Sequence, residues 1–145
     1  MSNLLDNIVA AFFLFVFAVV AIISLQIFNG IAGSGILGGY ETAFRGFYTS
    51  VNNVAIFIAV GMSLAAVFSG LLIRTHPAFF IVAVVLIFLE FIITPTWVNI
   101  YNNIAQSADI ATQTALANQT QILQILPLLT ALGTLLTILI GMVRE

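Results

Sequence analysis

The chain of 145 residues contains no cysteine, no lysine and only eight charged side chains, five acidic and three basic. Without cysteine it can form neither a disulfide framework nor a thiolate metal site. Its net charge of −2 gives no basic surface for nucleic acid. A charged fraction of 6% and a mean hydropathy of +1.23 leave too little polar surface to enclose a soluble core. The sequence therefore predicts an integral membrane protein with the lipid bilayer as a partner.

The apolar residues are gathered into four blocks that are almost free of charge. Each block holds roughly 20 residues, which at a rise of ~1.5 Å per residue crosses the ~30 Å hydrocarbon layer. Only helices satisfy their backbone within one segment in lipid, and no block alternates as barrel strands do. We expect an all-α helical bundle, one transmembrane domain over residues 1–145, with spans at residues 8–28, 54–73, 78–98 and 122–143.

The connection between the first two spans divides into two parts. Residues 29–39 hold five glycines and predict a flexible connector. The following segment, residues 40–48, places its aromatic side chains on one helical face and spaces Glu41 and Arg45 to pair. This pattern indicates a short interfacial helix. The alternative is that the segment forms the first part of a tilted second span.

Two features mark the end of the third span. Pro95 is expected to kink the helix or to end its regular hydrogen bonding near Phe91. The pair Asn102 and Asn103 is the best candidate for a turn. Residues 104–121 are polar but rich in Ala, Gln and Leu, without Gly or Pro, which predicts a largely helical stretch outside the hydrocarbon.

The few arginines and the aromatic residues suggest a sidedness. With four spans, both termini share a side with the turn at residues 74–77, where Pro77 suits a helix start. Arg74 and Arg144 then lie together, and the positive-inside rule predicts an interior, cytoplasmic location for both termini. The expected anchors at the opposite interface are Tyr40, Phe44, Phe47, Tyr48, Trp97 and Tyr101.

Glu90 stands alone in the middle of an apolar run. A carboxyl group at bilayer depth is expensive and usually faces a bundle interior or a cavity. It could form a proton or cation site, or it could be a protonated side chain bonded to a polar group of a neighbouring helix. The second interpretation is favoured because no other ionisable residue lies at matching depth. The candidate partners are Ser24, Gln26, Ser63, Ser69 and Thr134.

Signatures of enzymatic chemistry are missing from the sequence. It contains no nucleophile–base arrangement, phosphate loop or dinucleotide fingerprint, and Asp6, Glu41 and Asp109 are too dispersed to form a carboxylate pair. A lone turn histidine such as His76 is usually solvated. We therefore expect no enzymatic activity, no catalytic residues, no cofactor and no metal ligands.

Small residues at regular spacing in two of the spans indicate close helix packing. Gly133, Thr137 and Gly141 recur every four residues in the last span, and Ala66 and Gly70 repeat the spacing in the second. Such stripes let helices approach closely. They could pack spans two and four of one chain, or they could form a subunit contact in an oligomer or lattice. Since little of the chain lies outside the membrane, we expect it to act by assembly.

Four segments carry a resemblance to a known group of proteins. They are Asn52-Asn53, residues 74–77 (Arg-Thr-His-Pro), residues 97–103 (Trp-Val-Asn-Ile-Tyr-Asn-Asn) and residues 126–129 (Leu-Pro-Leu-Leu). The layout over about residues 50–140 resembles the small multi-span membrane proteins of tailless icosahedral viruses with an internal lipid membrane, the corticovirus-like and tectivirus-like phages and their archaeal counterparts. The resemblance implies a structural protein of the virion membrane that contacts other membrane or capsid proteins and ties the membrane to the shell.

Two other classes remain open. One is a holin-like, pore-forming lysis protein, although such proteins usually end in a charged tail and Arg144-Glu145 is a short one. The other is a small proton or cation carrier, or a channel subunit, that uses Glu90. The expected location is accordingly either a virion internal membrane or the cytoplasmic membrane of a host.

Overall fold

The fold is a bundle of long helices, seen in a computed structural model that describes residues 2–36, 38–72 and 77–143. All regular structure in these residues is helical, which agrees with the expected all-α class. The elements are α1 (Ser2–Ala32), the short 3₁₀ turn η1 (Gly38–Tyr40), α2 (Glu41–Leu72), α3 (Pro77–Ser107), α4 (Ile110–Ala115), α5 (Ala117–Gln124) and α6 (Leu126–Val143).

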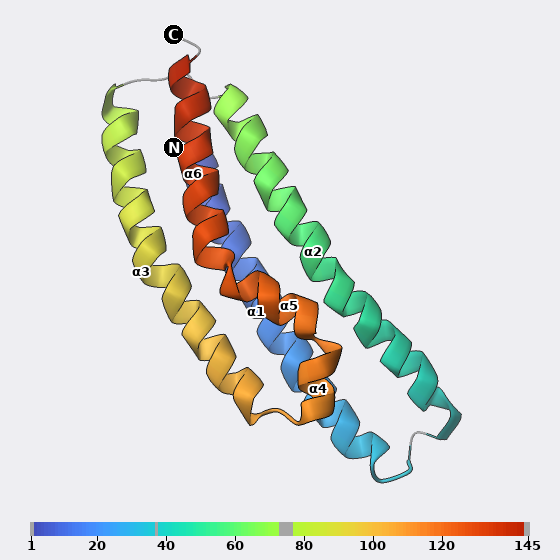
Figure 1. Ribbon diagram of the computed structural model, residues 1–145. Coiled ribbons are helices and arrows are strands. Elements are labelled where there is room, and N and C mark those ends of the chain that lie inside the picture. The colour runs from blue at the N-terminus through green and yellow to red at the C-terminus, as the bar shows by residue number, and fades with distance from the viewer. Residues whose placement is uncertain (1, 37, 73–76, 144–145) are drawn as a thin grey trace.

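The helices run up and down along the bundle (Figure 1). Helices α1, α2 and α3 alternate in direction, and α4, α5 and α6 together return along them. The start of α1 and the end of α6 lie at one end of the bundle, which we name the terminal end. Helices α4 and α5 lie toward the opposite end, which we name the α4 end.

Three helices are long and apolar enough to cross a membrane, at Leu5–Ala32, Gly38–Ala65 and Ile81–Ser107. A fourth span is possible if α5 and α6, which meet at a bend of 51°, are taken together as Ala117–Gln124 with Leu126–Ile140. Each long helix has 31 or 32 residues and is therefore about 47 Å long. This length exceeds the ~30 Å hydrocarbon layer.

Helix α2 corrects the prediction of a separate interfacial helix. It runs without interruption from Glu41 to Leu72, so residues 41–48 form its first two turns. Neither proline nor glycine stands between Tyr48 and Val54 to end the helix. The expected ion pair is present within these turns, with 2.8 Å between Arg45 Nη2 and Glu41 Oε1.

Helix α3 continues through Pro95, so the regular helix does not end near Phe91. A proline inside a helix removes only one intrahelical hydrogen bond. The kink expected at Pro95 stays a prediction. Helix α3 also continues through Asn102 and Asn103, which corrects the prediction of a turn at this pair, since apolar packing persists on its inner face at Tyr101 and Ala105. The turn instead follows Ser107, and residues 104–121 are helical apart from short breaks, as predicted.

The glycine-rich connector is shorter than the predicted residues 29–39, because residues 29–32 form the last turn of α1. After α1 ends at Ala32, the chain turns through Gly35 and Gly38, whose φ angles of 75° and 48° favour glycine. Pro77 begins α3, as predicted. Arg74, Thr75 and His76 lie outside the described residues.

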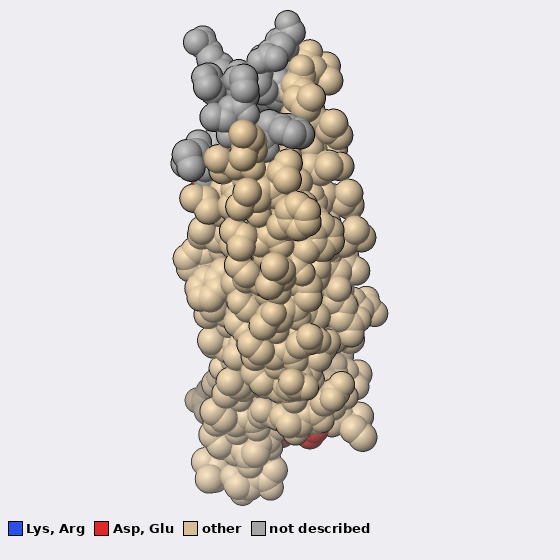
Figure 2. Space-filling model, turned by 90° about the vertical axis from the view of Figure 1, so that its left-hand side faces the viewer, with Lys and Arg blue, Asp and Glu red and all other residues tan. Residues whose placement is uncertain are grey.

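The interior of the bundle is built from small and aliphatic residues, whereas large aromatic side chains contribute to its exterior. The buried core includes small and aliphatic residues spaced along one face of α1, Ala11, Leu14, Ala18, Ile22 and Leu25. Several phenylalanine rings are on the exterior, with Phe57 76% exposed and Phe88 67% exposed. Figure 2 shows a face that carries one small acidic patch near its lower end and no other charged atoms outside the grey part. An exterior of this kind is energetically suited to lipid.

Candidate functional site

Polar side chains gather in the interior of the bundle, at several levels along its axis. Within the described residues, those buried are Asn7, Asn52, Glu90, Thr94, Thr112, Gln119, Thr130, Thr134 and Thr137. Buried polar groups need hydrogen-bond partners, because an unpaired group in an apolar interior costs free energy. Their partners define three clusters.

The first cluster joins α3, α6 and α1 around Glu90. The Glu90 side chain is fully buried, and Thr134 Oγ1 donates a hydrogen bond of 2.7 Å to its Oε1 atom. Asn7 Nδ2 in turn donates to Thr134 Oγ1 at 3.5 Å. The prediction that Glu90 faces a polar partner inside the bundle is confirmed, with Thr134 as that partner. In the described part of the chain nothing hydrogen-bonds to Glu90 Oε2.

The second cluster ties four helices together around Gln119 of α5. Its Nε2 atom donates to the backbone carbonyl of Ala18 in α1 at 3.1 Å and to the Tyr101 hydroxyl of α3 at 3.3 Å. The Tyr101 hydroxyl also lies 3.0 Å from Thr120 Oγ1. On the other side, the backbone N–H of Gln119 donates to Asn52 Oδ1 of α2 at 3.0 Å. The cluster fixes α5 against α1, α2 and α3.

The third cluster caps α4. Asp109 is its N-cap residue and accepts a hydrogen bond of 2.6 Å from the backbone N–H of Thr112. Asn29 of α1 donates to Thr112 Oγ1 at 2.9 Å and to Asp109 Oδ2 at 3.4 Å. The hydrogen bonds from the Thr112 hydroxyl and N–H hold the pKa of the Asp109 carboxyl below its usual range. The cluster thus holds the start of α4 against the C-terminal end of α1.

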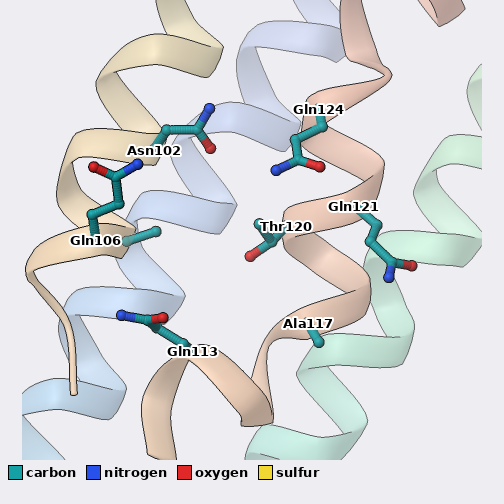
Figure 3. A pocket seen from close by; sticks show the side chains of 8 residues that line it. Asn102, Gln106, Gln113, Ala117, Thr120, Gln121 and Gln124 are labelled. Atoms are coloured by element: carbon teal, nitrogen blue, oxygen red, sulfur yellow. The ribbon is translucent and has the colours of Figure 1, made fainter. Parts of the chain in front are cut away.

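A hollow of about 380 Å³ opens beside the second cluster, between α3, α4 and α5 (Figure 3). Its polar lining consists of five carboxamides and one hydroxyl, with no charged side chain. The lining residues are Asn102, Ala105, Gln106, Gln113, Ala117, Thr120, Gln121 and Gln124. Such a surface offers both hydrogen-bond donors and acceptors without attracting ions.

A second hollow, of about 210 Å³, lies between α1, α2 and α4. It contains the guanidinium of Arg45, which is paired with Glu41, and is otherwise lined by uncharged side chains. The lining residues are Leu25, Asn29, Arg45, Tyr48, Thr49, Ala111 and Ala115. Since Arg45 already has its carboxylate partner, the hollow offers no free cation.

The six aromatic residues expected at an interface differ in exposure: three are exposed, two are buried and Trp97 is half-buried. Tyr40, Phe44 and Phe47 are exposed, as an interfacial position requires. Tyr48 and Tyr101 are buried instead, so the structure does not leave them free to contact headgroups. The hydrogen bonds of the Tyr101 hydroxyl inside the bundle explain its burial.

Trp97 is half-buried, and its ring stacks on that of Phe15 of α1, with ring centroids 5.8 Å apart. The ring of Phe12, also of α1, contacts the ring of Trp97 as well, with the two ring centroids 5.5 Å apart. Trp97 therefore contributes to packing between α1 and α3.

The small-residue stripe of the last span lies in a contact within the chain. Gly133 and Thr137 are buried, and the Thr137 hydroxyl donates to the Gly133 carbonyl. Helix α6 packs chiefly on α2 and α3. The structure therefore favours the interpretation of the stripe as packing within one chain over a subunit contact. The surroundings of Ala66, Gly70 and Gly141 lie outside the described residues, although each belongs to a helix.

Two residues of the second cluster were not singled out as site residues from the sequence. Asn52 entered only through the viral resemblance, and Gln119 is one of several similar residues in a polar stretch. The signal available was an asparagine pair inside an otherwise apolar helix. Among the described residues, no group of three or more His, Cys, Asp or Glu side chains could hold a metal ion.

The fold and the polar clusters define a class of molecule, an all-α bundle with three or four helices apolar enough to cross a membrane. Comparison with protein-family models, with curated proteins and with solved structures finds no match to this chain.

Proposed function

We propose that this chain is a non-enzymatic structural protein of a membrane, embedded as a helical bundle of up to four spans and linking that membrane to a protein layer. The virion internal membrane of a lipid-containing icosahedral virus, lying beneath its capsid, is the proposed setting. Both termini are proposed to lie on the same side of that membrane. The observation that carries the proposal is the contrast between the apolar exterior of the long helices and the polar side chains of α4 and α5, which are hydrogen-bonded to those helices.

The lengths of the helices support a bundle that projects from the bilayer. Helices of about 47 Å exceed a hydrocarbon layer of ~30 Å by about 17 Å. The polar residues of α4 and α5 and the amide-lined hollow lie toward the α4 end, which makes this end the natural projecting part.

Hydrogen bonds between α4, α5 and the long helices favour a rigid contact surface. The clusters around Gln119 and Asp109 fix α4 and α5 to the three long helices. Since a surface held in one conformation loses little conformational entropy on binding, it suits docking against a protein layer. The uncharged carboxamides of the hollow can hydrogen-bond to backbone or side-chain groups of a partner.

The proposal is tested by determining whether the chain is present in purified virus particles. Particles purified on a density gradient from an infected culture are expected to contain the chain, and extraction of their lipid is expected to release it. Expression of the chain alone should give membrane insertion without lysis. Lysis on expression would support the holin-like alternative, and a cation flux through liposomes containing the purified chain would support the carrier alternative. Absence of the chain from purified particles would overturn the virion proposal.

A further inference from the structure

The Glu90 carboxyl group lacks a counter-charge within the described residues. It is fully buried, with a single hydrogen bond from Thr134 to Oε1 and none to Oε2. An ionised carboxylate with one hydrogen bond in an apolar interior is strongly disfavoured. The group must therefore bind a positive charge to remain where the fold places it.

No side chain around the site supplies that charge in the described structure. Helices α1 and α6 pack directly against α3, and α2 packs on α6. Helix α6 carries no titratable residue between Leu126 and Val143. Asp6 of α1 is exposed and has the same sign as Glu90, and the charged pair of α2 lies in its first two turns, at the α4 end. The remaining titratable side chains of the described residues are those of Tyr40, Tyr48, Tyr101 and Asp109. The amino group of Met1 and the side chains of Arg74, His76, Arg144 and Glu145 lie outside the described residues.

Three helices nevertheless bring oxygen-bearing side chains to this point. Glu90 of α3 offers a carboxylate, Thr134 of α6 a hydroxyl and Asn7 of α1 a carboxamide. A half-turn of the Asn7 amide exchanges its Nδ2 and Oδ1 atoms, so that Asn7 can present an oxygen in place of its donor. Carboxylate, hydroxyl and amide oxygens are the ligands that hard cations prefer.

The charge count selects the kind of cation. One carboxylate and one monovalent cation together are neutral, whereas a divalent cation would leave a net positive charge in the apolar interior. We propose that Glu90, Thr134 and Asn7 form a site for one monovalent cation, either a proton carried by Glu90 or a small alkali ion such as Na⁺ held by the three side chains. The bound cation stabilises the packing of α3 against α6 and α1.

Thermal unfolding of the purified chain in a nonionic detergent tests this site. The pH is raised stepwise in choline chloride, and choline is then replaced by sodium, lithium or potassium at constant ionic strength. Because the folded chain binds the cation more tightly than the unfolded chain does, the wild-type Tm should fall as the pH rises in choline. Sodium or lithium should restore the Tm if an alkali ion occupies the site, and no salt should restore it if only a proton does.

Two variants test whether the dependence of the Tm on pH and cations arises from Glu90. Glu90→Gln has no charge to neutralise and should lose the dependence on both pH and cation. Glu41→Gln removes the carboxyl of the exposed pair with Arg45 and should keep the wild-type dependence. Infrared absorption of a protonated carboxyl group should be present in the wild-type chain and missing from Glu90→Gln. Added sodium should remove this band at constant pH only if an alkali ion displaces the proton.

Thr134→Val keeps the proposal testable if Glu90→Gln does not fold. It retains the carboxyl group but removes one oxygen ligand and the hydrogen bond to Oε1. It should shift the proton or sodium concentration at half-maximal effect by about tenfold, the scale expected for one hydrogen bond to a charged group. The proposal is overturned if Glu90→Gln responds to pH and sodium as the wild-type chain does, or if the wild-type chain shows neither a carboxyl band nor a sodium effect that Glu90→Gln abolishes.

Discussion

Three buried side-chain oxygen atoms have no hydrogen-bond partner in the described structure, Glu90 Oε2, Gln119 Oε1 and Asn29 Oδ1. The two carboxamides donate through their nitrogen atoms to groups on other helices, so their donors are satisfied and only an acceptor is left over. An unpaired acceptor is tolerated more readily than an unpaired N–H donor. Glu90 differs from both because its unpaired oxygen belongs to a group that can carry charge.

Asp109 gives a pH dependence that can be measured apart from that of Glu90. Its carboxyl has a lowered pKa in the folded chain, so it stabilises the folded state above the ordinary aspartate pKa of about 3.9. This stabilisation should be lost as the pH falls through the lowered folded pKa. Asp109→Asn should retain the N-cap and lose this acid-side dependence, whereas Asp109→Ala should cost about 0.5–2 kcal/mol at neutral pH. Unfolding followed by circular dichroism across acidic pH measures both, and an unchanged acid profile in Asp109→Asn would contradict the assignment.

At the scale of the elements, α5 depends on another helix for its N-terminal cap. Its own N-cap position, Leu116, has no side chain able to accept a hydrogen bond. Asn52 of α2 supplies the missing acceptor through its bond from the Gln119 N–H. Asn52, which is distant in the sequence, thus caps α5 and helps to position it against α2.

The two adjacent asparagines of α2 provide a matched test of this cap. Asn52→Ala should destabilise the fold by about 0.5–2 kcal/mol, the usual cost of losing an N-cap, and should speed hydrogen exchange at the Gln119 amide. Asn53→Ala should have a much smaller effect, because Asn53 is exposed and only accepts a bond of 3.4 Å from Asn118. Equal effects of the two substitutions on stability and exchange would argue against the cap.

Close packing of α6 provides a second test at this scale. Gly133 is buried within the chain, so Gly133→Leu should destabilise the monomer by about 1–3 kcal/mol through overpacking. Gly61→Leu is the control, since a Cβ atom at Gly61 would meet nothing within 4 Å. Thermal unfolding in detergent compares the two variants, and size-exclusion chromatography reports their assembly. A Gly133→Leu chain that unfolds normally but no longer self-associates would restore the subunit-contact interpretation.

The whole molecule places polar groups inside and large apolar rings outside. Phe57 and Phe88 contribute to the exterior, while Glu90, Gln119 and several threonines lie within. In water this arrangement would leave a large apolar surface exposed, whereas in lipid the exterior is favourable and the buried hydrogen bonds hold the helices together. Figure 1 places the start of α1 and the end of α6 together, which supports a proposed topology with both termini on one side.

Single-cysteine variants test this topology directly, because the chain has no cysteine of its own. Cysteines at Ser2, Thr75 and Arg144 should react with a membrane-impermeant maleimide from one face of sealed vesicles. Cysteines at Tyr40 and Ile110, both exposed at the α4 end, should react only from the other face. Labelling of Ser2→Cys and Arg144→Cys from opposite faces would contradict the topology.

The sequence by itself determined the helical class, the apolar blocks and the burial of Glu90. Each of these follows from local composition, since long apolar runs need an internally bonded backbone and a carboxyl at bilayer depth needs a polar partner. The glycine connector and the pairing of Glu41 with Arg45 are equally local, because they depend on residues within one or two turns.

Only the tertiary structure decided which long-range partners these segments meet. The inward position of Tyr101, near the end of α3, depends on contacts with residues far along the chain. The same holds for the choice of Thr134 among five candidate partners and for the cap that Asn52 gives to α5. The physical reason is that helical periodicity specifies which face of a helix is apolar, whereas the packing of several faces together specifies which polar groups come within 3 Å of one another.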